Sequence, residues 1–80
     1  MHNHKNIEIS KRIKTLRKEK RLTQINFGRL IRRDASTISK IESGELEASG
    51  LVRVAICNTF GIRKEWLLTG KEPKYDDRKR

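Results

Sequence analysis

The stretch from Asp34 to Ser43 carries short hydroxyl side chains and one lysine at spacings that gather them on one side of a helix. If Ile38 and Ile41 face a core, a helical wheel at about 100° per residue places small and polar residues on the outer side. These are Ser36, Lys40 and Ser43, flanked by Ser39 and by Ala35 at the helix start. Groups of this size can hydrogen bond base edges and touch thymine methyls, and a lysine can reach guanine or a phosphate. The pattern predicts contacts to bases from Ala35, Ser36, Ser39 and Lys40.

The sequence contains no set of residues that could carry out catalysis or bind a metal. The single cysteine, Cys57, excludes an internal disulfide and a cysteine-based zinc cage, and its place on an apolar stripe predicts a small buried side chain. His2 and His4 have no third ligand beside them, and no Ser/His/Asp set, carboxylate pair or phosphate-binding glycine loop is present. We expect no enzyme activity, no metal or cofactor and no small-molecule ligand.

The excess of positive charge lies in the first half of the chain. The 80 residues carry a net charge of +10, of which +9 falls in residues 1–40, −1 in 41–70 and +2 in 71–80. Such asymmetry predicts a face that meets a polyanion. The longest apolar run, residues 54–57, is too short to cross a bilayer, and no apolar signal segment follows the N-terminus. We therefore expect a cytoplasmic protein without a membrane partner.

Two short helices joined by a tight turn must position these groups. Thr23 is the expected N-cap of a helix over residues 23–31, Arg32-Arg33 form the turn, and Asp34 caps a second helix over 34–43. In this helix-turn-helix arrangement the second helix enters the major groove and the first crosses the backbone. The positive N-terminal end of the first helix can bind a phosphate. Phosphate contacts are expected from Arg17, Lys18, Arg21, Thr23, Gln24, Arg32 and Arg33.

Apolar spacing predicts three further helices and an all-α fold. They cover about residues 8–20, from Ser49 to Gly61, and from Arg63 to Thr69. Period-2 alternation is missing, so strands are not expected. One domain over 7–70 would lie between a flexible segment 1–6 and a flexible charged tail 71–80. The expected core is Ile9, Ile13, Leu16, Leu22, Phe27, Leu30, Ile31, Ile38, Ile41, Val52, Ile56, Phe60, Trp66 and Leu67.

Two motifs at a fixed distance, Leu22-Thr23-Gln24 and the run from Ser36 to Gly44, carry a resemblance to a known family. The sequence resembles the Cro/C1-type (XRE) helix-turn-helix family of phage repressors and bacterial regulators. Residues 13–20 and 65–70 match its first and last helices, so the resemblance covers about 7–70. It implies a five-helix, lambda-repressor-like domain that binds operator DNA, commonly as a symmetric dimer.

The resemblance also implies roles for individual positions. The family's DNA-contacting positions fall on Gln24, Ala35, Ser36, Ser39 and Lys40, and backbone phosphates are often touched at the positions of Thr37 and Ser43. In the turn the family usually has a glycine followed by an apolar residue, where this chain has Arg32-Arg33. Arg53 likewise replaces a usual aliphatic residue.

From these observations we expect a sequence-specific regulator of transcription, a repressor that binds a palindromic operator in double-stranded DNA as a homodimer. The dimer surface is expected on the fourth and fifth helices, with Leu46, Leu51 and Leu68 exposed. An alternative is a protein-interaction module, such as an antitoxin or accessory factor, whose basic face meets an acidic partner. A third is nucleoid or RNA binding without sequence preference.

Overall fold

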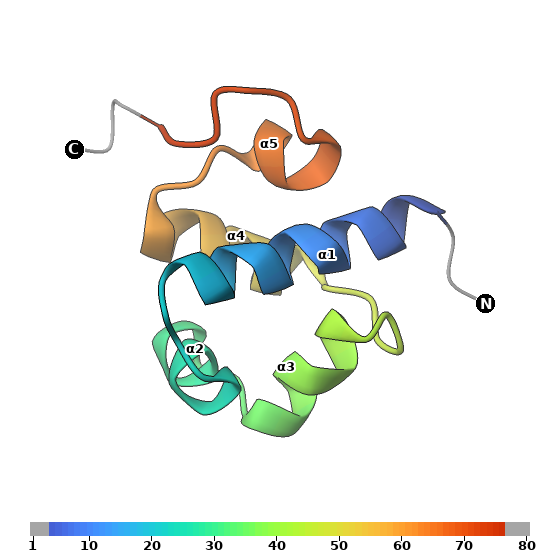
Figure 1. Ribbon diagram of the computed structural model, residues 1–80, viewed down its shortest axis with the longest axis vertical. Coiled ribbons are helices and arrows are strands. Elements are labelled where there is room, and N and C mark those ends of the chain that lie inside the picture. The colour runs from blue at the N-terminus through green and yellow to red at the C-terminus, as the bar shows by residue number, and fades with distance from the viewer. Residues whose placement is uncertain (1–3, 77–80) are drawn as a thin grey trace.

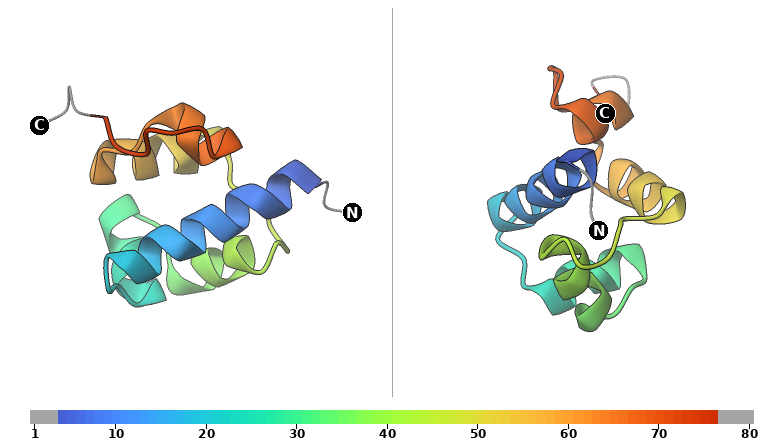
Figure 2. Two further views of the ribbon diagram at one scale, coloured as in Figure 1. Left: turned by 45° about the horizontal axis from the view of Figure 1, so that its top comes forward. Right: turned by 90° about the vertical axis from the view of Figure 1, so that its right-hand side faces the viewer.

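The computed structural model describes residues 4–76, and this part of the chain folds into helices. They are α1 (His4–Glu19), α2 (Gln24–Ile31), α3 (Ala35–Glu42), α4 (Gly50–Phe60) and α5 (Lys64–Thr69). In Figures 1 and 2, α2 and α3 lie together on one side of the long α1, α5 lies on the other side, and α4 runs alongside α1. Within 4–76 the only strand-like pairing is an isolated bridge between Ile62 and Tyr75. The expected all-α, five-helix fold is confirmed.

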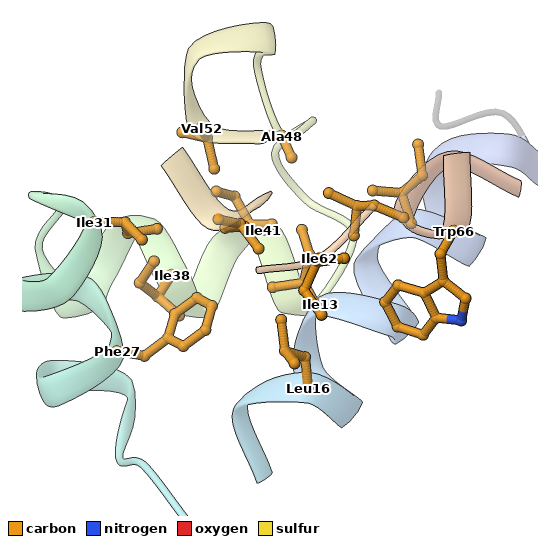
Figure 3. Close-up of a cluster of buried hydrophobic side chains, with 13 residues drawn as sticks. Ile13, Leu16, Phe27, Ile31, Ile38, Ile41, Ala48, Val52, Ile62 and Trp66 are labelled. Atoms are coloured by element: carbon orange, nitrogen blue, oxygen red, sulfur yellow. The ribbon is translucent and has the colours of Figure 1, made fainter. Parts of the chain in front are cut away.

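The core is made of apolar side chains from every helix, seen from close by in Figure 3. The rings of Phe27 in α2 and Phe60 in α4 stack at a centroid distance of 5.4 Å and join those two helices. Leu30 was expected in this core, but 51% of it is exposed. The buried residues of α2 are Phe27, Gly28 and Ile31, and together they define the side of the helix that faces the core. On a helical wheel Leu30 lies about 100° from the centre of that side. Leu22 and Phe60 are only partly buried.

Two residues outside the expected core complete it. Ala48, in the segment between α3 and α4, is 4% exposed, and Ile62, between α4 and α5, is 3% exposed. Neither lies on a helix, so helical periodicity had no means of finding them.

Both expected flexible segments carry some regular structure in their described residues, 4–6 and 71–76. Helix α1 begins at His4, not near Glu8, because polar residues continue the helix before the apolar stripe starts. Residues 71–76 form a return segment. Its Tyr75 pairs with Ile62, and the Arg63 N–H donates to the Lys74 carbonyl at 2.9 Å. The expected flexible tail is therefore folded back over 71–76, and its residues 77–80 lie outside the described part.

The return segment is held by its lysine and its aromatic ring. The Lys74 ammonium lies 4.6 Å from the centre of the Trp66 ring and forms an ion pair with Glu19. The Lys20 ammonium lies 4.8 Å from the ring of Tyr75. This part of the predicted flexible charged tail thus fastens α5 to the end of α1 through an ion pair and through cation–π contacts, each worth about 0.5–2 kcal/mol.

Candidate nucleic-acid interface

Helix α3 presents the side chains that the sequence assigned to base recognition. Its Ile38 and Ile41 are each 1% exposed and face the core. Ser36, Ser39 and Lys40 are exposed and Ala35 is half-buried. The outer side of α3 is therefore a strip of small polar groups with one ammonium, and we call Ala35, Ser36, Ser39 and Lys40 the α3 strip. Such a strip fits the major groove, whose width of about 12 Å admits a helix.

The turn between α2 and α3 keeps a left-handed residue without using glycine. Arg32 ends α2 at φ 61° and ψ 47°, in the left-handed region, and its N–H closes the helix on the Arg29 and Gly28 carbonyls. The N–H of Arg33 donates to the Gly28 carbonyl at 2.8 Å. A Cβ on Gly28 would lie 2.2 Å from the Arg33 carbonyl oxygen and 3.3 Å from Ile38. The lack of a side chain at Gly28 therefore makes room mainly for the backbone of the turn at Arg33. This close approach positions α3 against α2.

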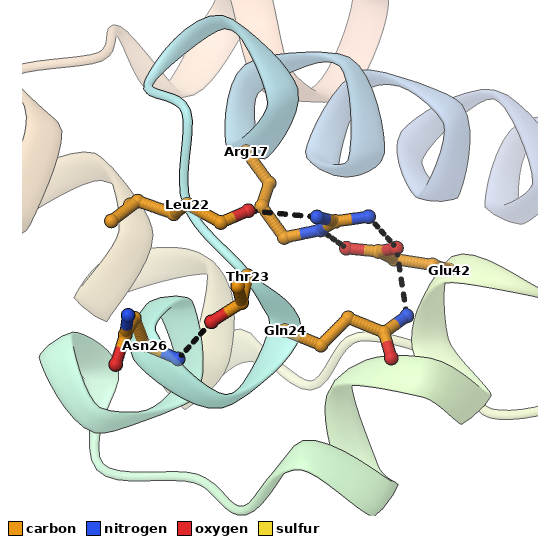
Figure 4. A network of polar contacts seen from close by, with 6 residues as sticks. All are labelled: Arg17, Leu22, Thr23, Gln24, Asn26 and Glu42. Atoms are coloured by element: carbon orange, nitrogen blue, oxygen red, sulfur yellow. Dashed lines mark hydrogen bonds and ion pairs between the residues drawn. The ribbon is translucent and has the colours of Figure 1, made fainter.

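A buried ion pair fixes α3 to both α1 and α2, as Figure 4 shows. Arg17 in α1 donates from Nε and from its second terminal nitrogen to the two oxygens of Glu42 at 2.6 and 3.0 Å. The Gln24 amide at the start of α2 donates to Glu42 at 3.1 Å. Arg17 also donates to the Leu22 carbonyl at 2.8 Å. A bidentate pair of this kind is strong and directional, so the three helices share one polar joint.

This joint gives Arg17 a structural role that the sequence did not predict, and its contact to phosphate stays a prediction. Its side chain is 12% exposed and that of Glu42 is 3% exposed, so in the structure the guanidinium faces protein acceptors. Gln24 is half-buried, and its bond to Glu42 fixes its amide beside the first turn of α2. Sequence reasoning gave Glu42 no role. It lies among other acids in residues 41–70, whose net charge is −1, so no local charge pattern singled it out.

The other residues expected at phosphates divide into two groups. Lys18, Arg21, Thr23 and Arg32 are exposed around the N-terminal end of α2 and the turn. Thr23 also caps α2, its hydroxyl accepting from the Asn26 N–H at 3.1 Å. In the second group the polar groups already bond within the protein. The Ser43 hydroxyl donates to the Lys40 carbonyl at 3.0 Å, Arg33 donates to the Arg32 carbonyl at 2.9 Å, and the Thr37 N–H is held by Asp34.

The charge on the N-cap of α3 is fixed by its hydrogen bonds. Hydrogen bonds from the Thr37 hydroxyl and from the Thr37 N–H, at 2.7 Å, lower the pKa of the Asp34 carboxyl, and the charge of Lys40 lowers it further. A carboxylate is also favoured at the positive end of a helix. Asp34 is therefore ionised at neutral pH and stabilises the start of α3.

The expected dimer residues do not share one environment. Leu51 in α4 is 75% exposed and Leu46 is 43% exposed, whereas Leu68 is partly buried and packs against the core. Leu68 is therefore less exposed than the sequence predicted, and its place on a dimer surface stays a prediction. Val54, which was not expected, is 53% exposed on the same helix as Leu51.

Comparison with known proteins now gives the family. Residues 10–73 match the helix-turn-helix domain family, and the chain belongs to it. This agrees with the resemblance to XRE-type domains and makes the protein a helix-turn-helix DNA-binding domain. Among curated proteins and solved structures, no significant match is found. No helix within residues 4–76 is long and apolar enough to span a membrane, and the same residues hold no cluster of His, Cys, Asp or Glu able to ligate a metal.

Proposed function

We propose that the protein is a sequence-specific transcriptional repressor that binds a palindromic operator as a dimer, with the α3 strip in the major groove. The observation that carries the proposal is the outward position of Ser36, Ser39 and Lys40 on a helix fastened by a buried ion pair. Side chains this short reach base edges only if their helix backbone lies deep in the groove. Rigid seating of α3 against α1 and α2 supports that depth.

Affinity and choice of sequence come from different residues in this proposal. Lys18, Arg21 and Arg32 surround the start of α2 and neutralise phosphates, which releases counterions and favours any duplex. The α3 strip then discriminates among sequences through base edges. Repression is the proposed outcome because occupancy of promoter DNA alone excludes other proteins, and the site as described needs no further group to achieve it.

The direct test selects duplexes from random DNA and then compares variants on the selected site. Replacing Ser36, Ser39 and Lys40 together by Ala is expected to weaken the selected site by at least about tenfold, since a lost base contact costs about 1–3 kcal/mol. Binding to a scrambled duplex should fall only through the loss of one cation. Lys11→Ala, on the exposed side of α1, is the control for that lost charge.

Unchanged affinity of the triple variant for the selected site would contradict the proposal. Failure to enrich any duplex at physiological salt, with capture of an acidic protein instead, would favour the interaction-module alternative. Equal affinity for selected and scrambled duplexes would indicate nucleic-acid binding without sequence preference.

A further inference from the structure

The return segment contacts the two residues at which α1 ends. The ammonium of Lys74 forms an ion pair with Glu19, the last residue of α1, and also lies over the ring of Trp66 in α5. The next residue, Tyr75, places its ring 4.8 Å from the ammonium of Lys20. Two neighbouring residues of the return segment therefore hold two neighbouring residues at the end of α1.

The backbone of the return segment is fastened elsewhere, independently of these side-chain contacts. The Arg63 N–H donates to the Lys74 carbonyl at 2.9 Å, and the Asp76 N–H donates to the Gly61 carbonyl at 2.8 Å. The Arg63 side chain also donates to the Pro73 carbonyl at 2.9 Å. The segment is therefore anchored on the connection between α4 and α5, and from this anchor its side chains can hold the end of α1 in place.

The end of α1 leads through a tight turn into the start of α2. Only Arg21 and Leu22 lie between Lys20 and Thr23, the N-cap of α2. Arg21 has φ 59°, in the left-handed region, and its N–H donates to the Lys18 carbonyl at 3.0 Å. Because the turn is so short and is hydrogen bonded to α1, the direction in which α1 ends determines where Arg21 and the N-terminal end of α2 point.

Lys20 differs from its basic neighbours in what its ammonium faces. Lys18 and Arg21 are exposed, whereas the Lys20 ammonium lies over the ring of Tyr75. We propose that Lys74 and Tyr75 are positioning residues for DNA binding, which hold the end of α1 so that the start of α2 meets backbone phosphates. The return segment lies on the side of α1 away from α2 and α3 (Figure 1), so this effect passes through α1 and needs no contact with the duplex. Its consequence for DNA rests on the proposed function.

The first variant removes the aromatic ring and leaves every charge in place. Tyr75→Leu keeps an apolar side chain beside the core but offers the Lys20 ammonium no π face. Affinity for the selected duplex and for a scrambled duplex should both fall about three- to tenfold, and the salt dependence should become shallower by about one phosphate contact. Tyr75→Phe keeps the ring and should bind like the wild type. Each titration is made where circular dichroism shows the variant fully folded, so a loss of stability alone changes neither quantity.

Two lysines of the return segment separate the hold on α1 from the loss of one charge. Lys74→Met removes the contacts with Glu19 and Trp66. Lys71→Met removes the same charge from a side chain that is 70% exposed and lies 3.9 Å from Glu65. Lys74→Met should bind the duplex at least about threefold more weakly than Lys71→Met, and Lys74→Arg should restore binding because a guanidinium can make both contacts. Equal binding by the two Met variants would overturn the inference.

Amide hydrogen exchange tests the hold on the turn without DNA. The N–H groups of Arg21 and Leu22 donate to carbonyls of α1, so in Tyr75→Leu they should exchange about tenfold faster than in the wild type. The N–H of Ile56, a fully buried residue of α4, should be accelerated much less. Equal acceleration at Ile56 would indicate a loss of global stability, and no change at Arg21 and Leu22 would show that the ring does not hold the turn. Either result overturns the inference.

The two kinds of measurement distinguish this inference from the proposed function. Faster exchange at the turn together with wild-type duplex binding by Tyr75→Leu would mean that the return segment does not position the turn for DNA, which also overturns the inference. If the exchange changes as expected and no duplex is ever enriched, the proposed operator binding fails while the hold of the return segment on the turn stands.

Discussion

The α2–α3 unit and α4 have helix ends with the same backbone conformations but with different residues at those positions. Helix α2 ends in the left-handed conformation at Arg32, with φ 61°, and α4 ends in the same conformation at Gly61, with φ 68°. Helix α3 begins with the carboxylate of Asp34, and α4 begins with the hydroxyl of Ser49. The two N-caps are equally favourable, since Asp and Ser are both preferred at that position. The C-caps differ. The left-handed position at the end of α4 has the glycine that the backbone prefers, whereas that of α2 has an arginine, which keeps a cation beside the proposed DNA-binding face at a strained position.

The largest expected effect tests whether the α2–α3 unit depends on its buried charge. Glu42→Ala leaves the guanidinium of Arg17 without its partner, and the free energy of unfolding should fall by about 3–5 kcal/mol. Urea denaturation measures it. The control is Glu47→Ala beside α4, where the carboxylate is exposed and the change should stay within about 0.5 kcal/mol.

A double variant distinguishes the effect of leaving one buried charge unpaired from the effect of removing both charges. Replacing Arg17 by Met and Glu42 by Leu removes both charges and keeps the volume, and it should be far more stable than Glu42→Ala alone. Equal loss in Glu42→Ala and Glu47→Ala would mean that the ion pair does not fasten α3.

The second effect concerns the two left-handed helix ends. Arg32→Gly should raise the free energy of unfolding by about 0.5–1 kcal/mol, because glycine removes the steric cost of a positive φ. The same variant should bind duplex DNA more weakly, with a shallower salt dependence. Gly61→Ala in α4 should instead lower stability by about 1 kcal/mol. Thermal melting and a salt titration check the pair, and a destabilised Arg32→Gly would contradict the strain at this turn.

The smallest effect is a pH dependence confined to the start of α3. Because the folded pKa of Asp34 is lowered, its stabilisation is complete above the unfolded value of about 3.9 and is lost as the pH falls through the folded value. Asp34→Asn keeps a capping oxygen and removes this titration. The difference in stability between wild type and variant should therefore be constant above about pH 5 and shrink below about pH 4. Ser49 gives α4 no such dependence, and amide exchange near Val52 should not change between wild type and variant.

Helix ends and faces could be predicted from the sequence where local rules act alone. Thr23, Asp34 and Ser49 are the N-caps found in the structure, and Gly61 and Gly70 end their helices as expected. The outward position of Ser36, Ser39 and Lys40 followed from the two isoleucines of α3. These features depend on residues close together in the chain.

The rest depended on partners distant in sequence. Arg17 was predicted to contact phosphate because its partner Glu42 is 25 positions away in the chain. In the same way, Lys74 and its ion-pair partner Glu19 are 55 positions apart. A charge pattern alone does not tell a solvated lysine from one over an aromatic ring. The prediction for Leu30 was wrong for a different reason. The three apolar residues Phe27, Leu30 and Ile31 fit two possible core-facing sides of α2, and only the packing of Gly28 against the turn backbone decides between those sides.

The central claim is that α3, not α4, meets the DNA. Amide chemical shifts of the isotope-labelled chain, followed by NMR during titration with a selected duplex, test it most directly. The largest changes should fall on Ser36, Ser39 and Lys40, with smaller ones around Thr23 and Arg32 and none beyond those of dimerisation on α4. Changes concentrated between Leu51 and Asn58, with α3 unmoved, would contradict the account.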